Sequence, residues 1–191
     1  MTTRAQIVSA ADGLFYENGF EHTSFSDIAA AVNISRGNFY YHFKSKDDIL
    51  DAVIAKRLDD TRQMLKRWES AGDTPADRIR SFIEILNVNG KKIKRYGCPV
   101  GSLSSELLKL NHVSKAQANK LFTLFRAWLR RQFVQMGCQD NADTLAMHVL
   151  AFSQGVATLG SAFGDEKFMQ QEVKLMNEWL DGVIKTVSAK A

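Results

Sequence analysis

The stretch Ser35-Arg-Gly-Asn-Phe-Tyr-Tyr-His-Phe-Lys-Ser-Lys46 decides the fold of the N-terminal part of the chain. It carries hydroxyls, an amide, an imidazole and cations within one short helix and its exit, and it contains no carboxylate. Such a surface is suited to contact with phosphates. Apolar residues in and just before it predict two short helices packed across a tight turn: Ile28, Ala29, Val32, Ile34, Phe39 and Phe43. The pattern predicts a helix-turn-helix, whose second helix enters the major groove of DNA.

Local signals mark where these short helices begin. Ser24 with Asp27 forms a capping box for the first helix, and Ser35 caps the second. Asn33 lies in the turn, where positive φ is needed and where Asn is one of the few residues besides glycine that tolerate it. The helix before them is expected to start after Thr3 as its cap and to stop at Gly19.

The composition indicates an all-α globular protein. Of 191 residues, 45% are hydrophobic and 24% are charged, only two are proline, and the β-branched residues follow 3.6-residue periods. We count about nine helices. No signal peptide opens the chain, and no uninterrupted apolar stretch approaches the roughly 18 residues that span a bilayer, so we expect a cytoplasmic protein with no membrane partner.

The charge is not concentrated where DNA contact is expected. The net charge is +4, yet residues 1–50 hold four cations against six carboxylates. DNA affinity must therefore come from the local placement of cations and from helix N-termini, not from a diffuse positive field. We interpret the cluster Lys91, Lys92, Lys94 and Arg95 as a solvated face.

The rest of the chain predicts a larger helical domain. A long helix runs from about Lys46 to Ser70, another opens at Thr74-Pro75 and stops by Gly97, and a short one covers about 102–110. An aromatic helix follows from Ser114 to Gly137, and two more close the chain. The penultimate helix has an apolar stripe and also a second face of small residues: Ala151, Gly155, Thr158 and Ala162. Because a helix that is apolar on two faces is buried on two sides, we expect a homodimer.

The first fifty residues resemble the TetR family of bacterial transcriptional regulators. The match runs through Arg4, Ile7, Ala10, Ala11, Leu14, Phe15, Gly19, Phe20, Thr23, Asp27, Ile28, Ala29, Ser35, Gly37, Tyr40, His42, Phe43, Lys44 and Lys46. The resemblance implies a helix-turn-helix DNA-binding domain over residues 1–46 and a ligand-binding and dimerisation domain over 47–191. It implies a homodimer that binds a palindromic double-stranded DNA operator as a repressor and is released by a small-molecule inducer.

The resemblance also places the DNA contacts. They are expected at Thr23, Ser24, Ser35, Arg36, Gly37, Asn38, Tyr40, Tyr41, His42 and Lys46. Arg36 and Asn38 have the reach and the donors for base edges, and Gly37 lets the backbone approach closely. The side chains of Thr23, Ser24, Tyr40, Tyr41, His42 and Lys46 are better suited to phosphate. Asn33 and Asn38 depart from the family's usual glycine and Thr or Ser.

The segment from Gly97 to Glu106, which reads Gly-Cys-Pro-Val-Gly-Ser-Leu-Ser-Ser-Glu, resembles one found in a subset of these repressors, some of which sense electrophiles or oxidants. Cys98 precedes a proline and a helix N-terminus and follows four cations, and each influence lowers a thiol pKa when it is close. A lone cysteine is more often a small buried apolar residue. Two switches therefore stay open: modification of Cys98, or reversible binding of an aromatic or apolar ligand.

A reversible ligand is expected among aromatic and aliphatic side chains. These are Phe82, Leu86, Asn89, Cys98, Leu103, Leu107, Phe122, Phe125 and Trp128, with Asn89, Ser105, Glu106 and His148 as possible polar anchors. The alternative at each position is dense core. We expect no cofactor, no metal ion and no enzymatic activity, since no metal-binding spacing, phosphate loop or nucleophile elbow occurs. A helical interaction module without DNA binding would leave the polar face of residues 24–46 unexplained.

Overall fold

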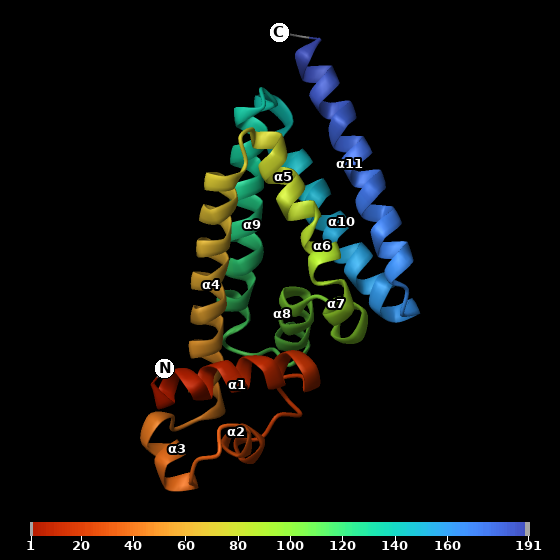
Figure 1. Cartoon of the computed structure of the whole chain (residues 1–191). Helices are drawn as coiled ribbons and strands as arrows, with labels where there is room; N and C mark the ends of the chain where they lie inside the picture. Colours follow the sequence, from red (N-terminus) through yellow and green to blue (C-terminus); the bar gives the residue numbers. More distant parts are fainter. Residues whose placement is uncertain (1, 190–191) are drawn as a thin grey trace. The chain divides into compact units, whose positions relative to one another are not determined.

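The computed structural model describes residues 2–189, apart from the side chain of Arg36. In this part of the chain all regular structure is helical (Figure 1). The helices are α1 (Thr3–Asn18), α2 (Phe25–Ala31), α3 (Arg36–His42), α4 (Lys46–Ala71), α5 (Pro75–Ile83), α6 (Ile85–Val88), α7 (Gly90–Tyr96), α8 (Pro99–Lys109), α9 (Lys115–Gln135), α10 (Ala142–Phe163) and α11 (Glu166–Ser188), with a 3₁₀ turn at Gln139–Asn141. The predicted all-α class is confirmed.

We expected about nine helices, and the structure has eleven α-helical segments in residues 2–189. The difference in number arises at one place. The single helix predicted between Pro75 and Gly97 is broken into α5, α6 and α7, with junctions at Glu84 and Asn89. Asn89 and the following Gly90 are poor helix formers, which explains the second break. A Cβ atom placed on Gly90 would touch Glu166 and Met169 at ordinary contact distances, so α7 lies close against the start of α11 there.

Most of the predicted helix starts are present. The Ser24 hydroxyl accepts from the Asp27 N–H at 3.2 Å and the Asp27 carboxylate accepts from the Ser24 N–H at 2.8 Å. Ser35 caps α3 by accepting from the Asn38 N–H at 3.3 Å. The prediction for α1 was wrong by one residue, because its cap is Thr2, which accepts from the Ala5 N–H. The helix propensities of neighbouring threonines do not distinguish the two positions.

The described chain forms two compact units that do not follow sequence order. The first unit contains the chain up to Thr61 together with Pro99–Leu121, and the second contains Arg62–Cys98 and the chain from Phe122 onward. The helix-turn-helix therefore shares its unit with α8. The functional division that we expect after Lys46 stays a prediction, since the compact units are drawn on packing alone.

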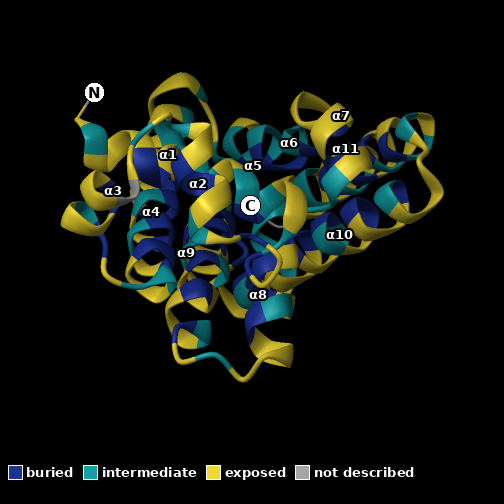
Figure 2. Cartoon of the chain, turned by 90° about the horizontal axis from the view of Figure 1, so that it is seen from below, coloured by how far each residue is buried: buried dark blue, intermediate teal, exposed yellow. Residues whose placement is uncertain are grey.

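Each unit has its own core. In the first, α1 packs against α2 and α8, and the rings of Phe15 and Phe20 meet edge to face at 5.3 Å. In the second, α11 packs against α5, α6 and α10, and the rings of Phe82 and Phe125 meet at 5.3 Å. Figure 2 shows the result, with the longer helices dark on one side and yellow on the other.

Candidate nucleic-acid interface

The turn between α2 and α3 has the geometry of a helix-turn-helix. Asn33 adopts φ +52°, as its position in the turn predicts. The Ile34 N–H donates to the Ala29 carbonyl at 3.2 Å and closes the turn. Ile28 and Phe39 are buried between the two helices, so the opposite side of α3 faces outward.

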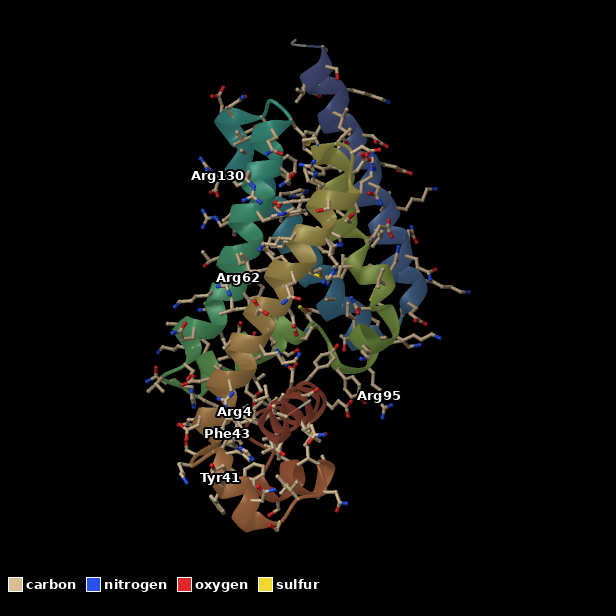
Figure 3. All side chains as sticks on the ribbon, turned by 60° about the vertical axis from the view of Figure 1, so that its left-hand side comes forward. Arg4, Tyr41, Phe43, Arg62, Arg95 and Arg130 are labelled. Carbon is tan, nitrogen blue, oxygen red and sulfur yellow. The ribbon has the colours of Figure 1, made fainter. Side chains whose placement is uncertain are left out.

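The outward side of α3 is open. Gly37 and Asn38 are exposed, and a Cβ atom added to Gly37 would meet no heavy atom within 4 Å. Tyr41 is 78% exposed and extends from α3 (Figure 3). A helix that exposes a glycine and an amide side chain near its start can lie against a groove wall.

The two tyrosines of α3, Tyr40 and Tyr41, lie in different surroundings. The ring of Tyr40 lies 5.5 Å from that of Phe25, so its body packs on α2 while the residue stays 47% exposed. Tyr41 contacts His42 edge to face at 5.1 Å and is otherwise directed to solvent. Lys44 donates to the Tyr40 carbonyl at 2.6 Å, which fixes the exit of the helix. Tyr40 therefore serves the core and the surface together.

Two of the predicted phosphate contacts have other roles in the structure. Thr23 is only 1% exposed and its hydroxyl donates to the Gly19 carbonyl at 2.7 Å, so its side chain cannot reach a phosphate. The Ser24 hydroxyl donates to the Asp27 carboxylate at 2.7 Å, and a phosphate would have to displace that acceptor. A short polar side chain at a helix start satisfies backbone groups first.

Lys46 also has partners inside the protein. Its Nζ atom donates to the Phe20 carbonyl at 3.0 Å and to the Glu21 carbonyl at 3.2 Å, and lies 4.4 Å from the centre of the Phe20 ring. The ammonium is half-buried and has used two of its three donors. The phosphate contact of Lys46 stays a prediction, and the structure gives this side chain a structural role in holding the turn after α1.

Another cation lies near the exit of α3. The guanidinium of Arg4, from the first turn of α1, stacks over the Phe43 ring at 4.8 Å (Figure 3). We did not predict Arg4 as a DNA contact, although its charge was visible in the sequence, because nothing in the sequence shows that the start of α1 approaches the exit of α3. The predicted contact Arg36 has its backbone in α3, and its side chain lies outside the described residues.

The predicted ligand residues are divided between the two units. Leu103 and Leu107 are buried in the first unit. Phe82, Leu86, Phe125 and Trp128 are buried in the second, where the Trp128 ring also lies 5.8 Å from that of Trp68. Phe122 and Cys98 are half-buried, and Asn89 is exposed and donates to the Ile85 carbonyl at 3.1 Å. Glu106 is no free anchor, since both its oxygens accept from backbone N–H groups.

The second unit contains two features that we did not predict from the sequence: a buried amide without a hydrogen-bond partner, and a surface hollow. Gln132 of α9 is fully buried, and its Nε2 atom has no hydrogen-bond partner in the described structure. A separate hollow of about 810 Å³ is lined by none of the predicted ligand residues. Its walls are Gly137, Cys138, Gln139, Asp140, Asn141, Leu145, Trp179, Gly182, Val183, Thr186 and Val187. Among residues 2–189, no group of three or more His, Cys, Asp or Glu is placed to hold a metal ion.

Comparison with known proteins agrees with this geometry. Residues 7–53 match the model of the bacterial regulatory proteins of the tetR family. The chain is 30% identical over 123 residues to an HTH-type transcriptional regulator encoded in the lacX 3′ region of Lactococcus lactis, covering 63% of each protein. It is 26% identical over 128 residues to the transcriptional repressor DhaR of a Mycobacterium species, covering 66% of this chain and 62% of DhaR. The matches thus span about three fifths of these relatives.

Solved structures extend the likeness over almost the whole chain. A TetR transcriptional regulator from Legionella pneumophila superposes with a TM-score of 0.83 at 27% identity and covers 96% of this chain and 97% of its own. The reduced form of NemR from Escherichia coli superposes with a TM-score of 0.77 at 18% identity, over 91% of this chain and 94% of its own, which shows a shared fold.

The open recognition helix, its capped partner and the long helical remainder define the class of helix-turn-helix regulators. Within this class residues 7–53 match the N-terminal domain of the tetR family, and the chain shares its fold with the TetR regulator from Legionella pneumophila. The relatives described above are regulators or repressors, in agreement with the expectation that the chain is not an enzyme.

Proposed function

We propose that the protein is a transcriptional repressor that binds a palindromic operator as a homodimer and is released from it by a small ligand. The observation that carries this proposal is the open outer face of α3 on a capped helix-turn-helix. Two relatives are named as a repressor and as a negative regulator, DhaR and the biofilm-operon regulator IcaR of Staphylococcus aureus. A cytoplasmic location follows from this role, since the operator is there.

In this proposal the residues of α3 have two kinds of contact. Arg36 and Asn38, in the first turn, read base edges, while Tyr40, Tyr41 and His42 hold phosphates and set the register. Ser35, at the cap, presents the helix N-terminus to a phosphate. Lys46 adds positive charge beside its backbone contacts.

Replacement of Asn38 and Tyr41 separates the two kinds of contact. Anisotropy titrations use double-stranded DNA that the wild-type protein selects from a random library, and a scrambled duplex. Asn38→Ala should erode the preference for the selected DNA, whereas Tyr41→Phe should weaken both duplexes alike, since phosphate contacts carry no sequence information. No preference of the wild type for any duplex would contradict DNA recognition.

The dimer would form through α10 and α11, which lie side by side (Figure 1). The predicted second face of α10 is exposed in this single chain, including Ala151 and Gly155. Leu159 is 44% exposed and Phe163 is 75% exposed on the same helix. Large apolar side chains beside small ones form a surface that a second copy can cover closely.

The apolar character of α10 has a second reading. The stretch Gln139–Phe163 is, by length and average composition alone, long and apolar enough to cross a membrane. Its sequence is broken by polar residues such as His148 and Gln154, and a helix buried by its own chain on one side and by a second copy on the other has the same composition. The proposed dimer accounts for it.

Introducing a charged residue on the exposed apolar face of α10 tests the proposed dimer. Phe163→Asp should convert the dimer to monomer in sedimentation velocity, because it places a carboxylate in an apolar contact. Val88→Asp is the control, since Val88 is 81% exposed on α6 and lies outside the proposed face. A dimer that survives Phe163→Asp unchanged would place the interface elsewhere.

The ligand is proposed to be aromatic and to carry a hydrogen-bond acceptor. Phe125, Trp128 and Gln132 follow each other at helical spacing on the buried side of α9. The buried Nε2 donor of Gln132 lacks a partner, and a buried donor left unpaired costs about 1–3 kcal/mol. The Gln132 Oε1 atom accepts from Arg78 at 3.5 Å, so a cation lies beside the amide. A phenolate or carboxylate on an aromatic ring would satisfy both groups.

Gln132→Met tests this ligand class. The variant keeps the volume and removes the donor, so release from DNA by a benzoate or phenol series should need about ten- to hundredfold more compound, since a hydrogen bond to a charged group contributes about 1.5–3 kcal/mol. Release by a purely aliphatic series should not change. Equal responses to both series would contradict an anchoring role for Gln132.

Modification of Cys98 is the second proposal for release. Cys98 is half-buried in the two-residue link between α7 and α8, directly before the first residue of α8. An adduct there would push on the start of α8, which belongs to the same unit as the helix-turn-helix. Loss of DNA binding after alkylation in the wild type but not in Cys98→Ser would support this switch. Retained binding in both would favour the reversible ligand.

A further inference from the structure

A carboxylate on α8 holds the turn between α1 and α2. The Glu106 Oε2 atom accepts from the Phe20 N–H at 3.0 Å, and its Oε1 atom accepts from the Glu21 N–H at 2.9 Å. More than eighty residues separate the partners in sequence. Hydrogen bonds to an ionised acceptor are roughly twice as strong as neutral ones, so this is a firm attachment.

The same two residues are held from the other side. Their carbonyl oxygens accept from the Nζ atom of Lys46, the first residue of α4. The N–H groups of Phe20 and Glu21 thus face an anion and their carbonyl groups face a cation. In the peptide group that joins Phe20 to Glu21, the N–H group faces the Glu106 carboxylate and the C=O group faces the Lys46 ammonium, so opposite charges from two different helices orient its dipole. We call this arrangement the turn clamp.

The clamped turn sets where α2 begins. Gly19 opens the turn at φ +86°, and a Cβ atom there would lie 3.1 Å from the Glu106 carboxylate, so only glycine fits without a shift. Phe20 is 2% exposed, and Thr23, which follows, is buried. The next residue is the N-cap of α2, so a displacement of the clamped peptides moves the start of α2 and, through its packing, α3.

The other end of α8 is attached to the same unit. The guanidinium of Arg57, on α4, donates to the Pro99 carbonyl at 2.7 Å and to the Asp12 carboxylate, on α1, at 2.6 Å. Just after α8, the His112 ring meets the Phe20 ring edge to face at 5.1 Å. Both ends of α8 are thereby tied to the helices that carry the helix-turn-helix.

We propose that Glu106 is a positioning residue for DNA recognition: it does not touch DNA, but it holds the α1–α2 turn so that α2 and α3 are presented in the binding geometry. The inference rests on the proposed function, because it needs α3 to bind DNA. In this proposal α8 acts on the helix-turn-helix through the two hydrogen bonds that Glu106 accepts from the Phe20 and Glu21 N–H groups.

The test uses a substitution for which simple electrostatics and the positioning role predict opposite changes in DNA affinity. Glu106→Gln removes a negative charge, which alone would strengthen binding to a polyanion. The positioning role predicts the opposite, because an amide keeps one acceptor and points a donor at an N–H group. We expect the full-length variant to bind the selected duplex about tenfold more weakly, with an unchanged salt slope because the phosphate contacts are the same.

Glu21→Gln is the matched control, since it makes the same charge change on an exposed side chain of the same turn. It should bind as tightly as the wild type or more tightly. Hydrogen exchange of the Phe20 and Glu21 amides reports on the turn clamp without DNA, and should accelerate at least fivefold in Glu106→Gln only. If Glu106→Gln does not fold, Glu106→Asp, which draws the carboxylate back by one methylene, replaces it.

Tighter or equal DNA binding by the Glu106 variant would overturn the positioning role, and so would unchanged amide exchange. Failure of the wild type to prefer any duplex would overturn the proposed function instead, because that titration does not involve the variant. Weaker binding with a reduced salt slope would mean that a phosphate contact was lost and would also overturn the proposal.

Discussion

Replacement of Gly37 by alanine should make the protein more stable and its DNA complex weaker. In the free protein the added methyl group meets no heavy atom within 4 Å, so it causes no clash. Alanine in place of helical glycine contributes about 0.5–1 kcal/mol. For a chain of this length, that gain raises the melting temperature by about 1–4 °C.

DNA binding should change in the other direction. If the backbone of α3 approaches the groove at Gly37, the methyl group occupies space that the complex needs. A displacement that costs about 1.4 kcal/mol lowers the affinity tenfold. The assay is an anisotropy titration with the selected duplex, combined with thermal unfolding followed by circular dichroism on the same preparations.

Gly13→Ala provides the matched control. Gly13 is an exposed glycine of α1 whose added Cβ also meets nothing within 4 Å, so it should raise stability and leave DNA affinity unchanged. Wild-type affinity in Gly37→Ala would refute close approach of α3 at this residue. An equal loss of affinity in both variants would show that helix rigidity, not contact with DNA, is responsible.

Three further outcomes test the fold. Gly160→Ala should lower the free energy of unfolding by about 1–3 kcal/mol in a urea titration, because its Cβ would lie 2.5 Å from the buried Met169 side chain. Asn33→Ala should cost about 1–2 kcal/mol at φ +52°, whereas Asn33→Gly should not destabilise. The Ser24 hydroxyl and N–H hold the pKa of Asp27 below its ordinary value of 3.8, so its contribution to stability is present above that pH and is lost as the pH falls through the lowered pKa. A carboxyl-carbon NMR titration should show this shift in the wild type and a smaller one in Ser24→Ala.

Features that depend on neighbouring residues were predictable from the sequence. The caps at Ser24 and Ser35 and the left-handed Asn33 were all confirmed, because each involves groups within four residues. The order of the helices followed from periodicity, since an apolar stripe needs no knowledge of its partner. The break between α5 and α7 was visible only as weak propensity near Gly90.

Features that depend on distant partners were not predictable. A lysine at position 46 reads as a phosphate contact, and only the placement of the α1–α2 turn gives it two carbonyl partners. Glu106 reads as a solvated or ligand-facing acid until its backbone partners are known. Thr23 looks like a surface hydroxyl, but the same turn buries it. In each case the error lies in the partner assigned to a polar group.

The return of Pro99–Leu121 to the first unit has a consequence for how the protein is made. Until residue 106 has been synthesised, the nascent helix-turn-helix lacks the Glu106 contacts with the α1–α2 turn, and until residue 99 it lacks the Arg57 contact at Pro99, so these contacts wait for a distant part of the chain. A fragment that ends at residue 61 would expose the surface of α1 that α8 covers. The support that α8 gives to the helix-turn-helix thus forms late during translation, and the N-terminal segment expressed alone should be less stable than the same segment in the full chain.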